Sequence, residues 1–557
     1  MLNIVLPVWG VALLISLSCW SIGARLVQSK NPLVGMLCGW CLFLFLCSLP
    51  WMIGVSANAL RPFFWAFFLA GLFLTVRDRR WREVICALVC TTAIAAIFGA
   101  PFIKFPGLLA YGAHGTDMWG YVMAAEWIQT HSYLQLPQPG IDPMRFNWTY
   151  HVLSIHERPL NYTSLSCIAS ASGLSAVNAY LAYPVTLLAS LAMALAREER
   201  VFRLRYWALA VVPAVVVAVH PLIVLPWIAG FFGGSIAAGF VAMGFAGCVG
   251  AEKGPARTEA LALSTLMIVF CAALYTQKFI LVALVVGGFP ALMPVVVMAL
   301  SHDFSPWRTL RPGRFAGWVM IFTGLVGLGL LLLGRDQPPN TGIDESARTA
   351  AGHFLGIFGG SSPFVWLGYA FSRDFDRIMT SNPVGLTALV VMLALFGIVA
   401  LTRWRDSRNL QADLQVPLMV ALAICAIAMA YDDELIMAKA LAVFGFTLLY
   451  LLAAVSSQLR HWTLGLIALA VCCLPGIRSA AEMEEILRGP YIECTVDNLS
   501  QDIDGQDWRF LAFLYFREDK ERLDWHKFPK SYVSIAHFLP DAEQRRIRKR
   551  YQLPDSY

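Results

Sequence analysis

Charged residues are scarce in this 557-residue chain: Asp, Glu, Lys and Arg together make up 14% of it. A water-soluble domain carries about 25% charged residues, so the composition excludes an ordinary soluble protein. Hydrophobic residues make up 58% of the chain, and its mean hydropathy is +0.63. Because so much apolar sequence needs the interior of a bilayer to cover it, we predict an integral membrane protein surrounded by membrane lipids.

Three other signals are missing. The apolar run that begins at Leu2 has no basic segment before it, so it is not a cleavable signal but an ordinary span. Most of the 13 cysteines lie inside apolar runs, which excludes a disulfide framework. Cys38 and Cys41 have the spacing of a redox motif, but their position within a span favours packing. No basic stripe interleaves with aromatic residues, so nucleic acid is not an expected partner.

Apolar segments of spanning length recur along the chain. They predict an all-α polytopic membrane protein with about 14 (roughly 12–14) transmembrane helices. The segments cover residues 3–23, 32–54, 60–76, 83–102, 175–196, 206–220, 222–248, 260–276, 279–300, 315–334, 383–402, 416–430, 436–455 and 462–476.

The basic residues indicate which connections share a side of the membrane. If the N-terminus is outside and the spans alternate, the inside loops are rich in Arg and Lys, and the outside connections are more acidic than basic. This bias matches the usual cytoplasmic excess of basic residues, and it also explains the net charge of +6. The inside loops contain Arg25, Lys30, Arg77, Arg79, Arg80, Arg82, Arg197, Arg200, Arg203, Arg205, Lys253, Arg257, Arg308, Arg311, Arg314, Arg403, Arg405, Arg408 and Arg460.

Two domains follow from this topology. Residues 1–476 form a transmembrane domain with large outward loops at 103–161 and 335–382, which we expect to carry short interfacial helices. Residues 477–557 form an outward C-terminal segment that is too short for a large core of its own. We predict a small extramembrane cap that leans on the transmembrane domain.

The first outward loop contains the most informative stretch. Residues 116–129 show the apolar spacing of a helix, which we expect to lie along the membrane interface. Asp117 stands at the start of this helix, and Tyr121 follows one turn later on the same face. A carboxylate at this place serves either as a helix cap or in chemistry.

The loop resembles those of the C-type glycosyltransferases, multispanning enzymes that use polyprenyl-phosphate-linked sugars. The resemblance is carried by the acidic stretch 115–121 (Gly-Thr-Asp-Met-Trp-Gly-Tyr) and by 158–162 (Arg-Pro-Leu-Asn-Tyr). Three further spans precede the one that leads into this loop, where the family usually has one span in total.

The resemblance implies a reaction and a location. Asp117 would act as general base on, or position, a hydroxyl of a glycan, lipid or protein acceptor, and the sugar would leave its lipid phosphate with inversion. The active site and the C-terminus would face the periplasm or exterior of a bacterial inner (plasma) membrane. No HxxxH or paired-Asp motif demands a metal, so no cofactor is expected.

A leaving lipid phosphate needs cationic partners. Lys439 is the only charged residue well inside a predicted span, which is a costly position. It follows the acidic run Asp432, Asp433 and Glu434. Lys439 either extends toward Asp432 or Glu434 or binds the donor phosphate, and both arrangements are compatible with one enzyme.

The second outward loop supplies further candidates. Periodicity over 344–357 predicts an interfacial helix that carries Arg348 and His353. In similar enzymes a second outer loop closes over the lipid donor, so Arg348 is a phosphate-binding candidate and His353 a supporting residue. A solvated helix face is the alternative. Lys278, at the outer end of the 279–300 span, is either another phosphate ligand or an interfacial anchor.

Two other functions remain open from the sequence. A polymerase or ligase of lipid-linked glycans would use an Arg and His pair in the outer loops, for which Arg348 and His353 are candidates. A membrane transporter would show repeated halves or carboxylates at mid-membrane, and the sequence shows neither. Three Asn-X-Ser/Thr matches in outward segments, at Asn147, Asn161 and Asn498, carry little weight.

Overall fold

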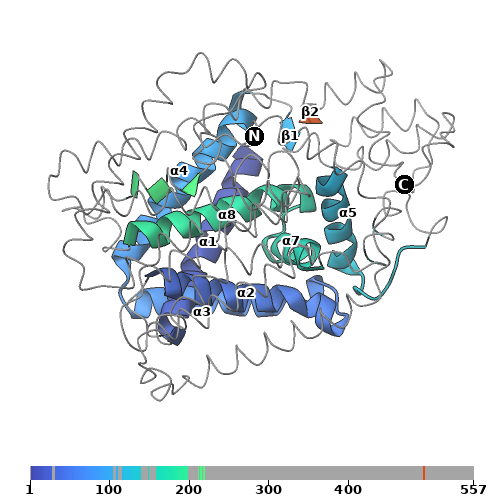
Figure 1. Cartoon of the computed structure of the whole chain (residues 1–557), viewed down its shortest axis with the longest axis horizontal. Coiled ribbons are helices and arrows are strands. Elements are labelled where there is room, and N and C mark those ends of the chain that lie inside the picture. Colours follow the sequence, from blue (N-terminus) through green and yellow to red (C-terminus); the bar gives the residue numbers. More distant parts are fainter. Residues whose placement is uncertain are drawn as a thin grey trace, which may run out of the picture.

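We analysed a computed structural model of the chain. It describes residues 2–27, 32–104, 108–110, 116–138, 159–197 and 494–495, together with positions 149, 153, 211–212, 214–215 and 218–219. Nearly all of the described elements are helices (Figure 1). They are α1 (Leu2–Val27), α2 (Pro32–Ile53), the short 3-10 helix η1 (Asn58–Leu60), α3 (Arg61–Arg77), α4 (Trp81–Lys104), α5 (Thr116–Thr130), α7 (Pro159–Ser172) and α8 (Ala176–Arg197).

The part of the chain that the structure describes contains two very short strands. β1 (Leu108–Ala110) pairs antiparallel with β2 (Cys494–Thr495). Apart from this pair, the described elements are helical, as expected for an all-α protein. The pair joins part of the first large loop to part of the C-terminal segment.

Five helical segments are long and apolar enough to cross a membrane: α1, α2, η1 with α3, α4 and α8. The predicted spans at 3–23, 32–54, 60–76, 83–102 and 175–196 match them within a few residues at each end, so a helix of spanning length and composition is confirmed at each of the five. The later predicted spans lie outside the described residues, apart from a few positions of 206–220.

Helix α1 is the centre of this arrangement, since it contacts all four other candidate spans. Its crossings use small residues that let backbones touch. A Cβ atom on Gly39 of α2 would lie 1.8 Å from the carbonyl oxygen of Cys19, and one on Gly71 of α3 would lie 2.5 Å from Cα of Ser18. The redox-like spacing at 38–41 therefore belongs to a helix crossing, and its two cysteines are buried there.

Side-chain hydrogen bonds add to these crossings. In apolar surroundings Ser and Thr side chains link helices because water is absent to compete for them. The links from α1 are Ser21 to Thr75 of α3 at 2.6 Å, Ser190 of α8 to Ser16 at 2.9 Å, and Trp9 to Thr92 of α4 at 3.1 Å.

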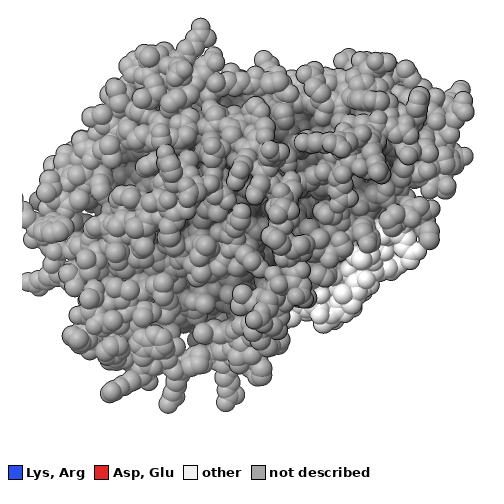
Figure 2. Space-filling view, turned by 45° about the vertical axis from the view of Figure 1, so that its right-hand side comes forward, with Lys and Arg blue, Asp and Glu red and all other residues white. Residues whose placement is uncertain are grey.

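The outer faces of α3 and α4 are apolar and exposed. On α3, Leu69, Phe73 and Val76 follow one another at helical spacing, each about 60% exposed. Trp81 and Ile85 continue the pattern on α4. Only a small described area is visible in Figure 2, and that area carries no charged residue. In a membrane protein, α3 and α4 therefore present a surface suited to lipid tails, whereas α8 is buried along its length.

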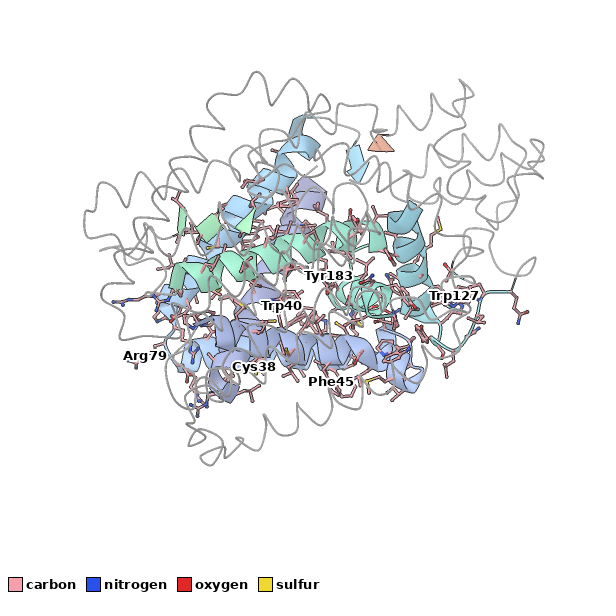
Figure 3. All side chains as sticks on the ribbon, in the orientation of Figure 1. Cys38, Trp40, Phe45, Arg79, Trp127 and Tyr183 are labelled. Atoms are coloured by element: carbon pink, nitrogen blue, oxygen red, sulfur yellow. The ribbon has the colours of Figure 1, made fainter. Side chains whose placement is uncertain are left out.

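One end of the described bundle is basic. Arg197, the last residue of α8, lies with Nη2 3.4 Å from Oε1 of Glu83 in the first turn of α4. The end of α8 and the start of α4 therefore share a side. Figure 3 shows Arg79 at this end and Trp127 at the opposite end of the bundle.

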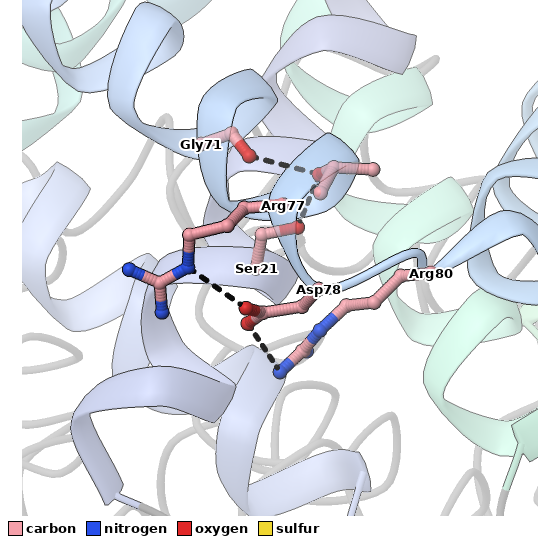
Figure 4. A network of polar contacts seen from close by, with 6 residues as sticks. Ser21, Gly71, Arg77, Asp78 and Arg80 are labelled. Atoms are coloured by element: carbon pink, nitrogen blue, oxygen red, sulfur yellow. Dashed lines mark hydrogen bonds and ion pairs between the residues drawn. The ribbon is translucent and has the colours of Figure 1, made fainter.

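The turn between α3 and α4 belongs to the same basic end (Figure 4). The Nε group of Arg77 donates a hydrogen bond of 3.1 Å to Asp78, and Arg80 approaches the same carboxylate at 3.5 Å. This hydrogen bond, with the charges of Arg77, Arg80 and Arg25, holds the pKa of Asp78 below its ordinary value. Because the charge of Arg25 acts on Asp78, the end of α1 lies near this turn as well. The predicted grouping of the first inside loops is thus confirmed.

The opposite end holds the α2–α3 turn and α5. The backbone N–H of Ala57 donates to the carbonyl of Ile128 at 2.9 Å, and the Ser132 hydroxyl donates to the carbonyl of Gly54. Figure 1 shows α5 running across the ends of α2 and α8. It is a crosswise helix at one end of the candidate spans, and its place at the membrane interface stays a prediction.

Cysteine labelling will test which end faces outward. Leu134 follows α5 and is 71% exposed, and Arg82 is exposed at the basic end. We expect Leu134→Cys to react with a membrane-impermeant maleimide in intact cells, and Arg82→Cys to react only in opened membranes, because basic ends stay in the cytoplasm. The reverse pattern would invert our orientation, and reaction of both in intact cells would contradict the two-sided arrangement.

Candidate functional site

Helix α5 forms one wall of the candidate site. It begins at Thr116, so Asp117 lies in its first turn, where a carboxylate interacts favourably with the helix dipole. The predicted helix over 116–129 is confirmed. Tyr121 is buried at 5% exposure, and the following residues Val122 and Ala125 are fully buried. The helix therefore presents most of its middle to the protein interior rather than to solvent.

Helix α7 forms the second wall, and the sequence did not predict it. The predicted loop 103–161 ends inside α7, whose residues 159–171 are all buried. The sequence did not predict this helix because its 14 residues, rich in Ser and Thr, are too short and too polar to read as a span. A usable signal was present: Pro159 at the first helical position and Gly173, with φ of 71°, just after the end.

The two walls are joined by a tyrosine pair. Helix α7 packs against α5, α2 and α8. The hydroxyl oxygens of Tyr133, just after α5, and Tyr162, in the first turn of α7, lie 2.9 Å apart, and their rings are nearly parallel at 6.0 Å between centroids. Burial raises the pKa of the Tyr133 phenol well above its ordinary value. Tyr133 therefore stays neutral and keeps its capacity to donate a hydrogen bond.

The end of α5 is fixed in the same region. The indole N–H of Trp127 donates to the carbonyl of Gln135 at 2.7 Å, and the Trp127 ring stacks on His131 with 3.6 Å between centroids. These contacts fold residues 131–135 back over the end of the helix. They hold Tyr133 in position toward α7.

Polar side chains on α7 divide into two kinds. Thr163, Ser164 and Ser172 donate to backbone carbonyls one turn earlier, at 2.9, 2.5 and 2.5 Å. Asn161 is fully buried, and neither its Nδ2 nor its Oδ1 atom has a hydrogen-bond partner in the part of the chain that the structure describes. This burial also means that the Asn161-Tyr162-Thr163 match is no accessible glycosylation site.

The two segments on which the family resemblance rests begin two helices that pack against each other, since residues 116–121 begin α5 and residues 159–162 begin α7. The contact of Tyr133 with Tyr162 places the start of α7 beside the end of α5, which is the end away from Asp117. The side chain of Asp117 is outside what the structure describes, so its role stays a prediction. The other predicted site residues lie wholly outside the described residues, namely Lys278, Arg348, His353, Asp432, Asp433, Glu434 and Lys439. Their meeting with Asp117 likewise stays a prediction.

Comparison with known proteins leaves the family of this chain open. No protein-family model matches the chain, and no curated protein shows significant similarity to it. The fold and the packing of α5 against α7 are therefore the observations from which its function has to be inferred.

Proposed function

We propose that the chain is a glycosyltransferase that moves a sugar from a polyprenyl-phosphate donor to an acceptor hydroxyl at the outer face of the membrane. The observation that carries the proposal is the packing of α5, with Asp117 in its first turn, against the buried helix α7. Both helices start in the segments that resemble the C-type glycosyltransferases. A crosswise helix at the ends of the spans also suits a site that must meet a lipid-linked donor and a polar acceptor.

The proposed reaction assigns a role to each group. The acceptor oxygen attacks the anomeric carbon as the bond from that carbon to the phosphate oxygen breaks. The acceptor proton passes to the carboxylate of Asp117, and the polyprenyl phosphate leaves with the electron pair. Cations stabilise the departing phosphate, for which Lys439, Arg348 and Lys278 are the proposed groups. The anomeric configuration inverts because attack comes from the face opposite the phosphate.

A direct assay tests this proposal. Purified protein in liposomes would receive a panel of labelled polyprenyl-phosphate hexoses and pentoses, with lipid, glycan and peptide acceptors. We expect at least one donor to yield a labelled product together with free polyprenyl phosphate in equal amounts. Release of phosphate without a labelled product would indicate hydrolysis. If no donor in the panel is consumed by protein that is folded and inserted, the proposed function is wrong.

A further inference from the structure

Asn161 stands out among the buried polar residues of the described chain. It is the third residue of α7 and is 0% exposed, yet both atoms of its amide lack a hydrogen-bond partner among the described residues. A buried donor or acceptor left without a partner costs about 1–3 kcal/mol. An amide is therefore unfavourable at this position unless a group from outside the chain supplies the missing hydrogen bonds.

Some hydroxyl groups of α7 are satisfied within the helix, whereas the buried hydroxyls of Ser166 and Ser170 lack a partner among the described residues. Thr163 and Ser164 both bond back to carbonyls of the preceding turn. An asparagine amide presents a donor and an acceptor on two separate atoms, and one carbonyl cannot satisfy both. A leucine of similar size would fill the position at no such cost.

Other polar groups on α5 and α7, and at Thr149 between them in the sequence, lack partners among the described residues. Pro159 occupies the first position of α7, so the next N–H groups of this helix start have no partner within the helix. Among the described residues, the Nε2 atom of Gln129, near the end of α5, and the buried hydroxyl of Thr149, which precedes α7 in the sequence, also lack a hydrogen-bond partner.

The chemistry of the amide limits what can complete it. A phosphate offers only acceptors, so Oδ1 would stay unpaired, and a cation would leave Nδ2 unpaired. Two neighbouring hydroxyl groups satisfy both atoms, since one accepts from Nδ2 and the other donates to Oδ1. We infer that Asn161 binds a pair of hydroxyls on the sugar that is transferred. This assignment rests on the proposed function and adds a sugar-binding residue to it.

The test compares Asn161→Leu with Thr163→Val, a matched change in the same turn whose hydroxyl is already satisfied by Pro159. Thermal unfolding would be followed in detergent with glucose, galactose, mannose and arabinose titrated as free sugars. Sugars also stabilise proteins by exclusion from their surface, but that rise does not saturate and is common to all variants. The informative signal is the saturable shift.

We expect Asn161→Leu to unfold at a higher temperature than wild type without sugar, because an unsatisfied amide is removed. The same variant should bind sugar about 10- to 100-fold more weakly, as expected for two lost hydrogen bonds, with a matching rise in KM for the donor. Thr163→Val should keep wild-type sugar binding. Asn161→Ala, which removes the amide without filling its space, should weaken binding like Asn161→Leu.

Several results would overturn the inference. If Asn161→Leu binds sugar as tightly as wild type, Asn161 does not bind the sugar. If Thr163→Val loses as much sugar affinity as Asn161→Leu, the loss comes from a general disturbance of α7. If neither Asn161→Leu nor Asn161→Ala inserts as folded protein, the amide is required for folding and is not available to bind a ligand. The two proposals fail separately. Saturable sugar binding without any transfer rejects the proposed function, whereas transfer with an unchanged KM in Asn161→Leu rejects the sugar-binding role.

Discussion

Replacing Asp117 with Asn is expected to lower sugar transfer by about 100- to 10,000-fold, the range that a positioned general base contributes. The amide keeps the size of the side chain and removes its ability to accept a proton. Because the acceptor would still bind, kcat should fall much more than KM rises. The measurement is the initial rate of transfer from the labelled donor that the wild-type protein uses.

The matched control is Asp78→Asn at the basic end of the bundle. Asp78 is also an aspartate next to a helix end, but its partners are Arg77 and Arg80 at the opposite side of the described spans. An exposed ion pair of this kind contributes little to stability, so this variant should transfer sugar at the wild-type rate. Asp117→Glu should retain part of the activity. Full activity in Asp117→Asn would leave this carboxylate with a helix-capping role only.

Replacing Gly39 with Ala is expected to destabilise the folded protein by about 3 kcal/mol, the upper part of the usual range for overpacking. The new Cβ would lie 1.8 Å from the carbonyl oxygen of Cys19 and 2.5 Å from its Cα atom. Both are backbone atoms of α1, so the clash is relieved only if the two helices separate. Since α1 contacts every other candidate span, the separation should disturb the whole described bundle.

The matched control for this change is Gly10→Ala, also within α1. A Cβ at Gly10 meets nothing within 4 Å, so this variant should gain up to about 1 kcal/mol from the better helix propensity of Ala. The comparison uses the unfolding midpoint of each purified variant in mixed detergent micelles that contain increasing SDS. Equal midpoints for the two variants would show that α1 and α2 do not cross closely at Gly39.

The sequence alone predicted the positions of the five candidate spans that the structure describes. It also predicted which of their ends lie on the same side. Span positions depend on local hydropathy, which a run of 20 residues expresses without help from the rest of the chain. The grouping of Arg25, Arg77, Arg80 and Arg197 at one end follows from span parity, and the contacts of Asp78 and Glu83 confirm it. The helix after Thr116 was also predictable, because its apolar residues repeat at helical spacing.

Only the tertiary structure decided what surrounds α7. Its sequence is too polar for a hydropathy signal, and its burial comes from α2, α5 and α8, which are distant in sequence. That Asn161 lacks a partner among the described residues depends on all these neighbours together, and the contact of Gly39 with Cys19 likewise depends on how two helices cross. The local sequence pattern determines which segments enter the membrane. Whether a buried polar side chain finds hydrogen-bond partners depends on how those segments pack against one another.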